Sequence, residues 1–256
     1  MTSANEDANQ TLIEHLTELR VRIMWSLLWI FCGFVLCWGF SDVLFDIIRR
    51  PIAPYLKDTT GGLVFTAPTD KFIAHIKVSG LFGVILSCPF WIYNLWKFIV
   101  PALYEKEKKF AVSFVGFGSC LFLLGVNFVY FIVLPMAFKF LMTFGGTTDS
   151  PMITIGEYLS FFIMTTLVFG AAFEMPLVLA LLGVLGVITS DFLRNYRRYA
   201  YVLLALASAL FTPPDALSMV MMLVPMMLLY ESSVLLVKMM EKMARDKEKS
   251  LTTPKL

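Results

Sequence analysis

The chain has 256 residues, of which 58% are hydrophobic and only 16% charged, and its mean hydropathy is +0.76. Soluble domains are roughly half apolar and about a quarter charged, so this composition excludes an ordinary soluble protein and indicates an integral membrane protein. The net charge of +2 gives no reason to expect a nucleic-acid partner. The apolar runs leave little room for a soluble domain, so we expect one membrane-embedded helical bundle.

The sequence offers no cofactor or metal site. All four cysteines fall inside apolar runs, their spacings match no zinc pattern, and the two histidines are isolated from each other. No Gly-Lys pair occurs, so a P-loop is absent, and no Ser/His/Asp or Cys/His arrangement stands out. We therefore expect no disulfide, no metal, no cofactor and no enzymatic activity. The first 22 residues are polar, so we also expect no cleavable signal peptide.

The first three apolar runs are each long enough to cross a bilayer, which needs about 20 residues. Residues 23–40 carry no charge and form the first predicted span. Residues 72–99 form the second, with a kink predicted at Pro89. Residues 110–134 form the third, which we expect Pro135 to end.

The fourth span is predicted at residues 154–187, where the sequence Thr154-Ile-Gly-Glu157 is typical of a helix capping box. Glu174 lies in its middle. Two shorter apolar runs follow at 199–211 and 216–230, joined by a turn at Thr212-Pro-Pro-Asp215. At 1.5 Å per residue these runs reach only about 20–23 Å, which suits either a re-entrant hairpin or two short spans. We favour two short spans, which makes six.

The distribution of Lys and Arg sets the orientation of a six-span chain. Fifteen of these residues fall on the side that holds both termini, and only 5 fall on the opposite side. Because cytoplasmic segments carry the excess of basic residues, both termini are predicted to be cytoplasmic. The expected organisation is a cytoplasmic segment with an amphipathic helix at 1–22, a six-span membrane domain at 23–237 and a basic cytoplasmic tail at 238–256.

The N-terminal segment has the features of an amphipathic lead-in helix. Thr11-Leu-Ile-Glu14 is a second capping box and predicts a helix start at Thr11. Glu18 and Arg22 stand four residues apart, a spacing that favours a solvated ion pair on one helix face. At the other end of the chain, Asp215 is placed to cap the start of the sixth span.

Four short motifs together resemble the TatC family, the polytopic subunit of the twin-arginine protein translocase. They are IEHLTELR at 13–20, FIVPALY at 98–104, AFEMP at 172–176 and FTPPD at 211–215. They stand in the order of the family, and the similarity runs from about residue 11 to 240. The resemblance implies an all-α, concave bundle of six spans in the bacterial cytoplasmic (inner) membrane.

The resemblance also implies a function and a set of site residues. TatC proteins bind signal peptides that carry consecutive arginines and help to move folded proteins across the membrane with the proton-motive force. Their partners are single-span TatA- and TatB-type subunits, and a multimeric receptor complex is implied. The family's binding residues correspond here to Glu18, Arg20, Phe98 and Glu107, and Pro51 is a position that matters in the first outside loop. The chemistry agrees, because two adjacent guanidinium groups need two carboxylate acceptors.

Glu174 has two interpretations. A charge at mid-membrane costs about 2.5–3.5 kcal/mol on insertion scales, so such residues rarely face lipid. Glu174 is either a protonated acid bonded to a neighbouring helix or a polar, hydrated point that contacts a signal peptide or a partner helix. Thr212 is a second candidate for the partner contact. An alternative function is a small proton-coupled secondary transporter with Glu174 as its coupling carboxylate, although no inverted repeat is visible.

Overall fold

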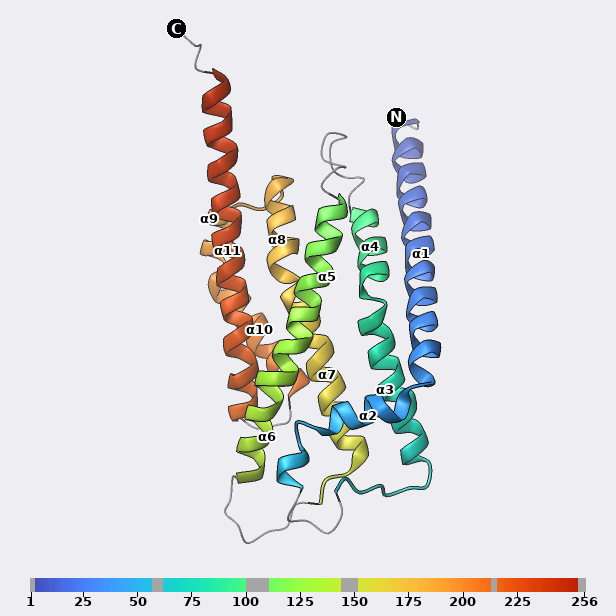
Figure 1. The fold of residues 1–256 in the computed structure, drawn as a ribbon. Helices are drawn as coiled ribbons and strands as arrows, with labels where there is room; N and C mark the ends of the chain where they lie inside the picture. Colours follow the sequence, from blue (N-terminus) through green and yellow to red (C-terminus); the bar gives the residue numbers. More distant parts are fainter. Residues whose placement is uncertain (1–2, 57–61, 100–110, 144–151, 213–215, 253–256) are drawn as a thin grey trace. The chain divides into compact units, whose positions relative to one another are not determined.

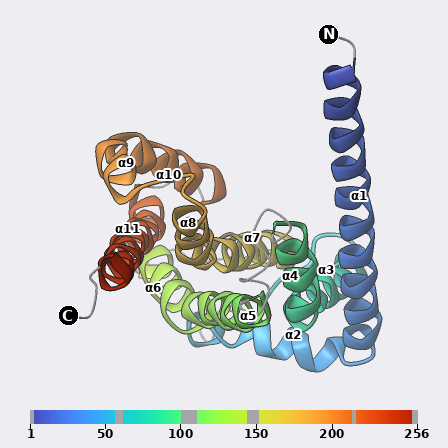
Figure 2. The same ribbon diagram turned by 90° about the horizontal axis from the view of Figure 1, so that it is seen from above.

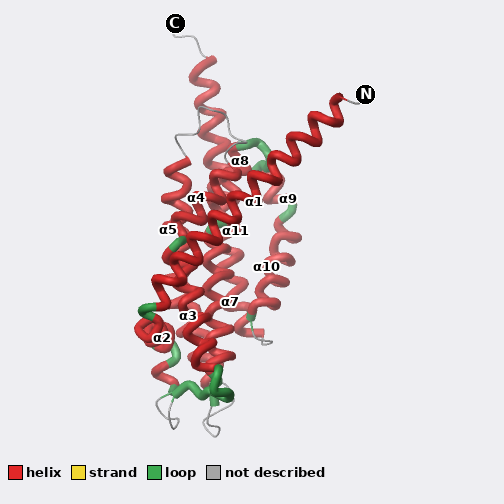
Figure 3. Tube along the Cα trace, turned by 90° about the vertical axis from the view of Figure 1, so that its right-hand side faces the viewer, coloured by secondary structure: helices red, strands yellow, loops and turns green. Residues whose placement is uncertain are grey.

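The computed structural model describes residues 3–56, 62–99, 111–143, 152–212 and 216–252, and these residues are almost entirely helical (Figures 1 and 3). Within them the only extended pairing is an isolated bridge between Val64 and Thr154. The prediction of an all-α fold is confirmed. The chain packs as two compact units, Met1–Asp46 with His75–Cys120 and Ile47–Ala74 with Leu121–Leu256.

The first unit is organised around α1, which runs from Ser3 to Trp38 without a break. The predicted helix start at Thr11 is therefore wrong, because the helix begins at Ser3 and the lead-in segment is continuous with the first span. An apolar span of this length propagates helix in both directions, since each added residue costs little once a helix exists. The short helix α2 (Ser41–Arg49), which the sequence analysis missed, follows directly.

The second span is bent, as the proline predicted. Helices α3 (Asp70–Leu86) and α4 (Cys88–Ile99) meet at an angle of 58° at Ser87, two residues before Pro89. Side chains after the break satisfy two carbonyls at the end of α3: Ser87 Oγ donates to Gly83 O at 2.7 Å, and Trp91 Nε1 donates to Val84 O at 3.1 Å. These bonds make the bend a defined feature of the structure.

Helix α1 packs closely on this bent hairpin. Gly33 and Gly83 allow the backbones of α1 and α3 to touch, since a Cβ built on Gly33 would lie 2.6 Å from Gly83 O. Further along, the rings of Trp29 and Phe90 stack with centroids 4.2 Å apart. Membrane helices usually associate through small residues that allow close packing, because the hydrophobic effect does not drive helices together within lipid.

The third span does not end at Pro135, and that prediction is wrong. Helix α5 (Ala111–Phe128) passes through a π-helical turn at Val129–Val133 and continues as α6 (Leu134–Thr143). Pro135 is the second residue of α6. After a wide π turn its ring no longer meets a carbonyl in α-helical register, so it sits as a proline does in a first helical turn.

The fourth span consists of α7 (Ile155–Phe173) and α8 (Met175–Val184), with Glu174 at the break. The predicted cap is confirmed, because the Thr154 side chain accepts a hydrogen bond from Glu157 N at 3.3 Å. The chain then forms α9 (Ser190–Asn195), α10 (Arg197–Phe211) and α11 (Ala216–Thr252).

Among the described residues, four helical stretches are long and apolar enough to cross a membrane, and the bent α3–α4 pair makes a fifth. Helix α10 covers the run that was predicted as a short fifth span; it has 15 residues, or about 22 Å, and is not one of these five. The run at 216–230 was predicted as a short sixth span, but the helix that contains it is much longer than 15 residues. Helix α11 continues through Glu231, and its apolar stretch extends over Ser218–Met243.

Candidate functional site

The N-terminal half of α1 carries the first two predicted site residues. Glu18 Oε1 accepts a hydrogen bond from Arg22 Nη2 at 2.9 Å, which is the ion pair that the four-residue spacing indicated. The side chains of Arg22 and Glu18 remain 20% and 34% exposed, so this is a boundary pair rather than a buried one. Arg20 is exposed on a different face of the helix. Figure 2 shows that the N-terminal end of α1 extends away from α4.

Phe98 lies in the last turn of α4 and is half-buried. Its helix is anchored by Trp96, a buried residue whose ring stands 5.3 Å from that of Phe114 on α5. Lys97 is exposed and lies 5.6 Å above the ring of Tyr93. Glu107, the second predicted carboxylate, lies outside the described residues.

Glu174 sits at the junction of α7 and α8 and is half-buried. Its backbone N–H bonds to Ala171 O at 3.1 Å, and Pro176 follows in the first turn of α8. Its Oε1 atom is buried and has no hydrogen-bond partner among the described residues. A buried carboxyl oxygen without a donor is costly unless it is protonated, hydrated or bonded to another molecule. The geometry therefore leaves Glu174 available as a polar contact.

Thr212 ends α10, and its hydroxyl donates to Ser208 O at 2.7 Å. This local bond occupies the hydroxyl proton, but the oxygen can still accept a bond. Asp215, the predicted cap of the sixth span, lies outside the described residues. The helix α11 begins at Ala216, directly after it.

Pro51 is buried in the turn between α2 and the 3-10 helix Ala53–Tyr55. Two tyrosine hydroxyls hold this turn in place. Tyr130 donates to Ile47 O at 2.9 Å, and Tyr158 forms a short bond to Ile48 O. Both carbonyls belong to the last turn of α2, and the Ile47 carbonyl also accepts a bond from Arg50 N at 3.2 Å. No local pattern indicates these contacts, because 83 and 110 residues separate the partners along the chain.

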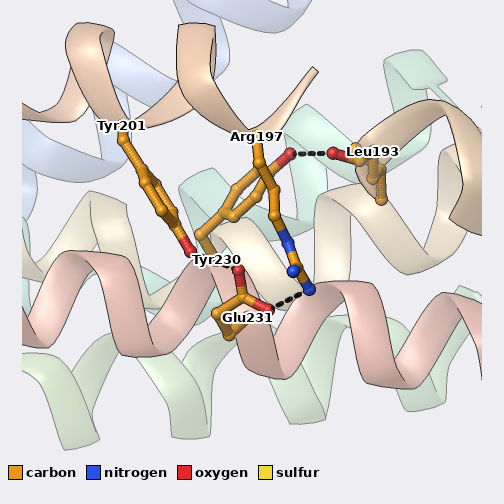
Figure 4. A network of polar contacts seen from close by, with 5 residues as sticks. All are labelled: Leu193, Arg197, Tyr201, Tyr230 and Glu231. Carbon is orange, nitrogen blue, oxygen red and sulfur yellow. Dashed lines mark hydrogen bonds and ion pairs between the residues drawn. The ribbon is translucent and has the colours of Figure 1, made fainter. Parts of the chain in front are cut away.

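A polar network that the sequence analysis missed joins α10 to α11 (Figure 4). Arg197 Nη2 lies 2.6 Å from Glu231 Oε2, and Tyr201 donates to the other oxygen of the same carboxylate. Nearby, the Tyr230 hydroxyl donates to Leu193 O at 2.8 Å. The sequence feature that could have indicated this network is Glu231, an acid within an apolar segment. Its partner Arg197 stands at the start of the preceding apolar segment.

These features identify the class of protein, which is a multi-pass helical membrane protein with polar groups at its helix ends and at one helix break. A family model described as Sec-independent protein translocase protein (TatC) matches residues 14–225. The chain belongs to the TatC family.

Individual relatives agree with this assignment. The TatC protein of Desulforapulum autotrophicum is 38% identical over 232 residues, covering 91% of this chain and 86% of the relative. That of Campylobacter jejuni is 37% identical over 240 residues, covering 93% and 98%. A crystal structure described as the twin-arginine translocase receptor TatC superposes with a TM-score of 0.81 at 37% identity, covering 88% of this chain and 98% of that one. None of these matches supports the alternative of a proton-coupled secondary transporter.

Proposed function

We propose that this chain is the signal-peptide receptor and core subunit of a twin-arginine translocase. It would export folded proteins across the bacterial cytoplasmic (inner) membrane with the proton-motive force, as a binding and transport component rather than an enzyme. The observation that carries the proposal is the similarity, over nearly the whole chain, to a solved twin-arginine translocase receptor. The chemistry of α1 adds to it.

Glu18 suits the recognition of a guanidinium group. Its carboxylate already accepts one bond from Arg22 through Oε1. A carboxylate has about four acceptor positions, so an incoming arginine can share it without breaking the existing pair. Partial exposure at the membrane boundary makes the site reachable and strengthens a charge pair relative to bulk water. Arg22 would thus orient Glu18 before the peptide arrives.

Recognition of two consecutive arginines requires a second acceptor, and we assign that role to Glu107 in the loop after α4. Phe98, half-buried at the end of α4, would pack against an apolar residue that follows the arginines. Arg20, exposed on α1, completes the set of family positions. The proposal places the four residues on the cytoplasmic side, in agreement with the distribution of Lys and Arg.

The proposal also requires partners. Six helices of this size enclose no passage wide enough for a folded protein, so transport would need single-span TatA- and TatB-type subunits and self-association in a multimeric complex. Glu174, with a buried oxygen that lacks a donor among the described residues, and Thr212 are the proposed contacts within the membrane. Pro51 would shape the outside loop, held by the Tyr158 bond to Ile48 O.

Titration of the purified full chain with a labelled twin-arginine signal peptide tests the proposal. Glu107→Ala is expected to weaken binding about tenfold or more, because it removes one partner of a charge-assisted, bidentate contact. A peptide with Lys in place of both arginines should also bind more weakly, since an ammonium is a point charge rather than a planar fork.

The matched control is Glu157→Ala, which removes an exposed acid at the N-terminus of α7. The Thr154 cap uses the backbone N–H of Glu157, so this variant keeps the helix start intact. Peptide binding should match that of the unaltered protein. Equal affinity of Glu107→Ala and the control, or equal affinity for both peptides, would rule out the proposed site.

A further inference from the structure

We propose that one face of the α9–α10 segment binds the headgroups of anionic phospholipids at the membrane surface. This face, called here the α9–α10 surface, consists of Phe192, Arg194, Tyr196, Arg198 and Tyr199. All five side chains are exposed. The inference is independent of signal-peptide binding, because it concerns a different segment and a different ligand.

The opposite face of the same segment is fixed to α11. At the start of α9, Ser190 N and Ser190 Oγ both bond to the Glu241 carboxylate, at 2.8 and 2.5 Å. In the middle, the buried Leu193 presents its carbonyl to the Tyr230 hydroxyl. At the start of α10, Arg197 pairs with Glu231 (Figure 4). These contacts along one side hold the segment rigidly and leave the α9–α10 surface facing outward.

Three aromatic rings form a continuous row on that surface. Phe192 and Tyr196 have ring centroids 4.5 Å apart, and Tyr196 and Tyr199 are 5.9 Å apart. The three side chains are about half exposed, at 48%, 50% and 51%. A row of exposed rings this regular is unusual in water, but it is favourable at a membrane–water boundary, where an aromatic ring meets acyl chains and its polar edge meets headgroups.

The charges on this surface are positive. Arg197 turns inward and is neutralised by Glu231, whereas Arg194 and Arg198 form no ion pair with any described residue. The Arg198 guanidinium lies 4.7 Å from the centre of the Tyr199 ring and donates to the Tyr199 hydroxyl at 2.8 Å. This contact orients the guanidinium and leaves other N–H groups for a ligand. One acid, the exposed Asp191, lies on the same segment.

The position in the fold explains why a lipid is the ligand that fits. Helix α9 lies between the end of α8, the last part of an apolar span, and the start of the apolar α10. Gly186, with φ of +70°, lies two residues after the end of α8 and lets the chain turn there. The surface therefore stands at the depth of the headgroups. Arginine pairs with phosphate by parallel N–H bonds, and basic groups at this level attract anionic lipids.

Native mass spectrometry of the purified full chain in detergent, titrated with phosphatidylglycerol, tests the inference. Separate control titrations use phosphatidylcholine, a lipid without net charge, and inorganic phosphate, a free anion. We expect the unaltered chain to retain phosphatidylglycerol in preference to both. The double variant R194Q/R198Q should lower phosphatidylglycerol affinity roughly tenfold to thirtyfold, since each basic group near a membrane surface contributes roughly a fivefold effect.

Two control variants make the test specific. R194K/R198K keeps the charge and should retain most of the binding. K238Q/K242Q removes two exposed charges from α11 and should leave the affinity nearly unchanged. The inference is overturned if R194Q/R198Q binds phosphatidylglycerol as the unaltered chain does, or if K238Q/K242Q loses as much affinity. It is also overturned if inorganic phosphate competes fully with the lipid, because the site would then be one for a free anion.

Discussion

The contact between α1 and α3 can be tested by adding a single methyl group to Gly83. A Cβ at this position would lie 2.7 Å from Phe34 N and 2.9 Å from Phe34 Cα, both backbone atoms of α1. A side chain could rotate away from such a clash, but a helix backbone cannot, so α1 and α3 must separate. Gly83→Ala is therefore expected to destabilise the first unit. The contact matters for function because α1 carries Glu18.

The size of the effect follows from two opposing contributions. Overpacking of a tight contact costs about 1–3 kcal/mol, and a rigid backbone neighbour places this case toward the upper end. Replacing glycine by alanine within a helix stabilises the folded state by about 1 kcal/mol through helix propensity. The net loss is about 1–2 kcal/mol, which lowers the melting temperature by about 2–8 °C for a chain of this length.

Gly80, one turn earlier on α3, provides a matched control because a Cβ there meets no atom within 4 Å. Gly80→Ala should be neutral or stabilising by up to about 1 kcal/mol through helix propensity alone. The assay is thermal unfolding of both variants in the same detergent, followed by size-exclusion chromatography, with signal-peptide affinity as a second readout. If the two variants melt at the same temperature, the close approach of α1 and α3 is refuted.

Three further predictions concern single polar contacts, each measured by thermal unfolding in detergent. Glu231→Gln should lower the free energy of unfolding by about 1–2 kcal/mol, because it leaves Arg197 without its countercharge. The double variant Glu231→Gln/Arg197→Gln should lose less stability than the sum of the two single variants. Strict additivity would show that the pair is not coupled. Tyr158→Phe should cost about 1 kcal/mol by removing the donor to Ile48 O, and no change in stability would contradict the assigned bond. Thr154→Ala should cost about 1 kcal/mol and Thr154→Ser almost nothing, so equal losses would exclude capping as the cause.

Many residues and local features of the candidate site could be predicted from the sequence, but the contacts between residues far apart in the chain could not. The pairing of Glu18 with Arg22 follows from a four-residue spacing that any helix brings together. The break at Glu174 follows from Pro176, which has no backbone N–H to donate to a helical carbonyl. By contrast, the two tyrosine bonds around Pro51 join residues far apart along the chain, and no local pattern encodes them.

The sequence by itself determined the features that depend on local chemistry: the apolar spans, the Thr154 cap and the bend before Pro89. Their cause lies within one turn of helix or in the transfer of side chains from water to lipid. Only the tertiary structure decided that α11 continues past Glu231. A lone acid would be expected to end an apolar span, but Arg197 and Tyr201 on α10 satisfy its carboxylate. A buried or half-buried charge is tolerated only when its partners are in place, and folding alone brings those partners together.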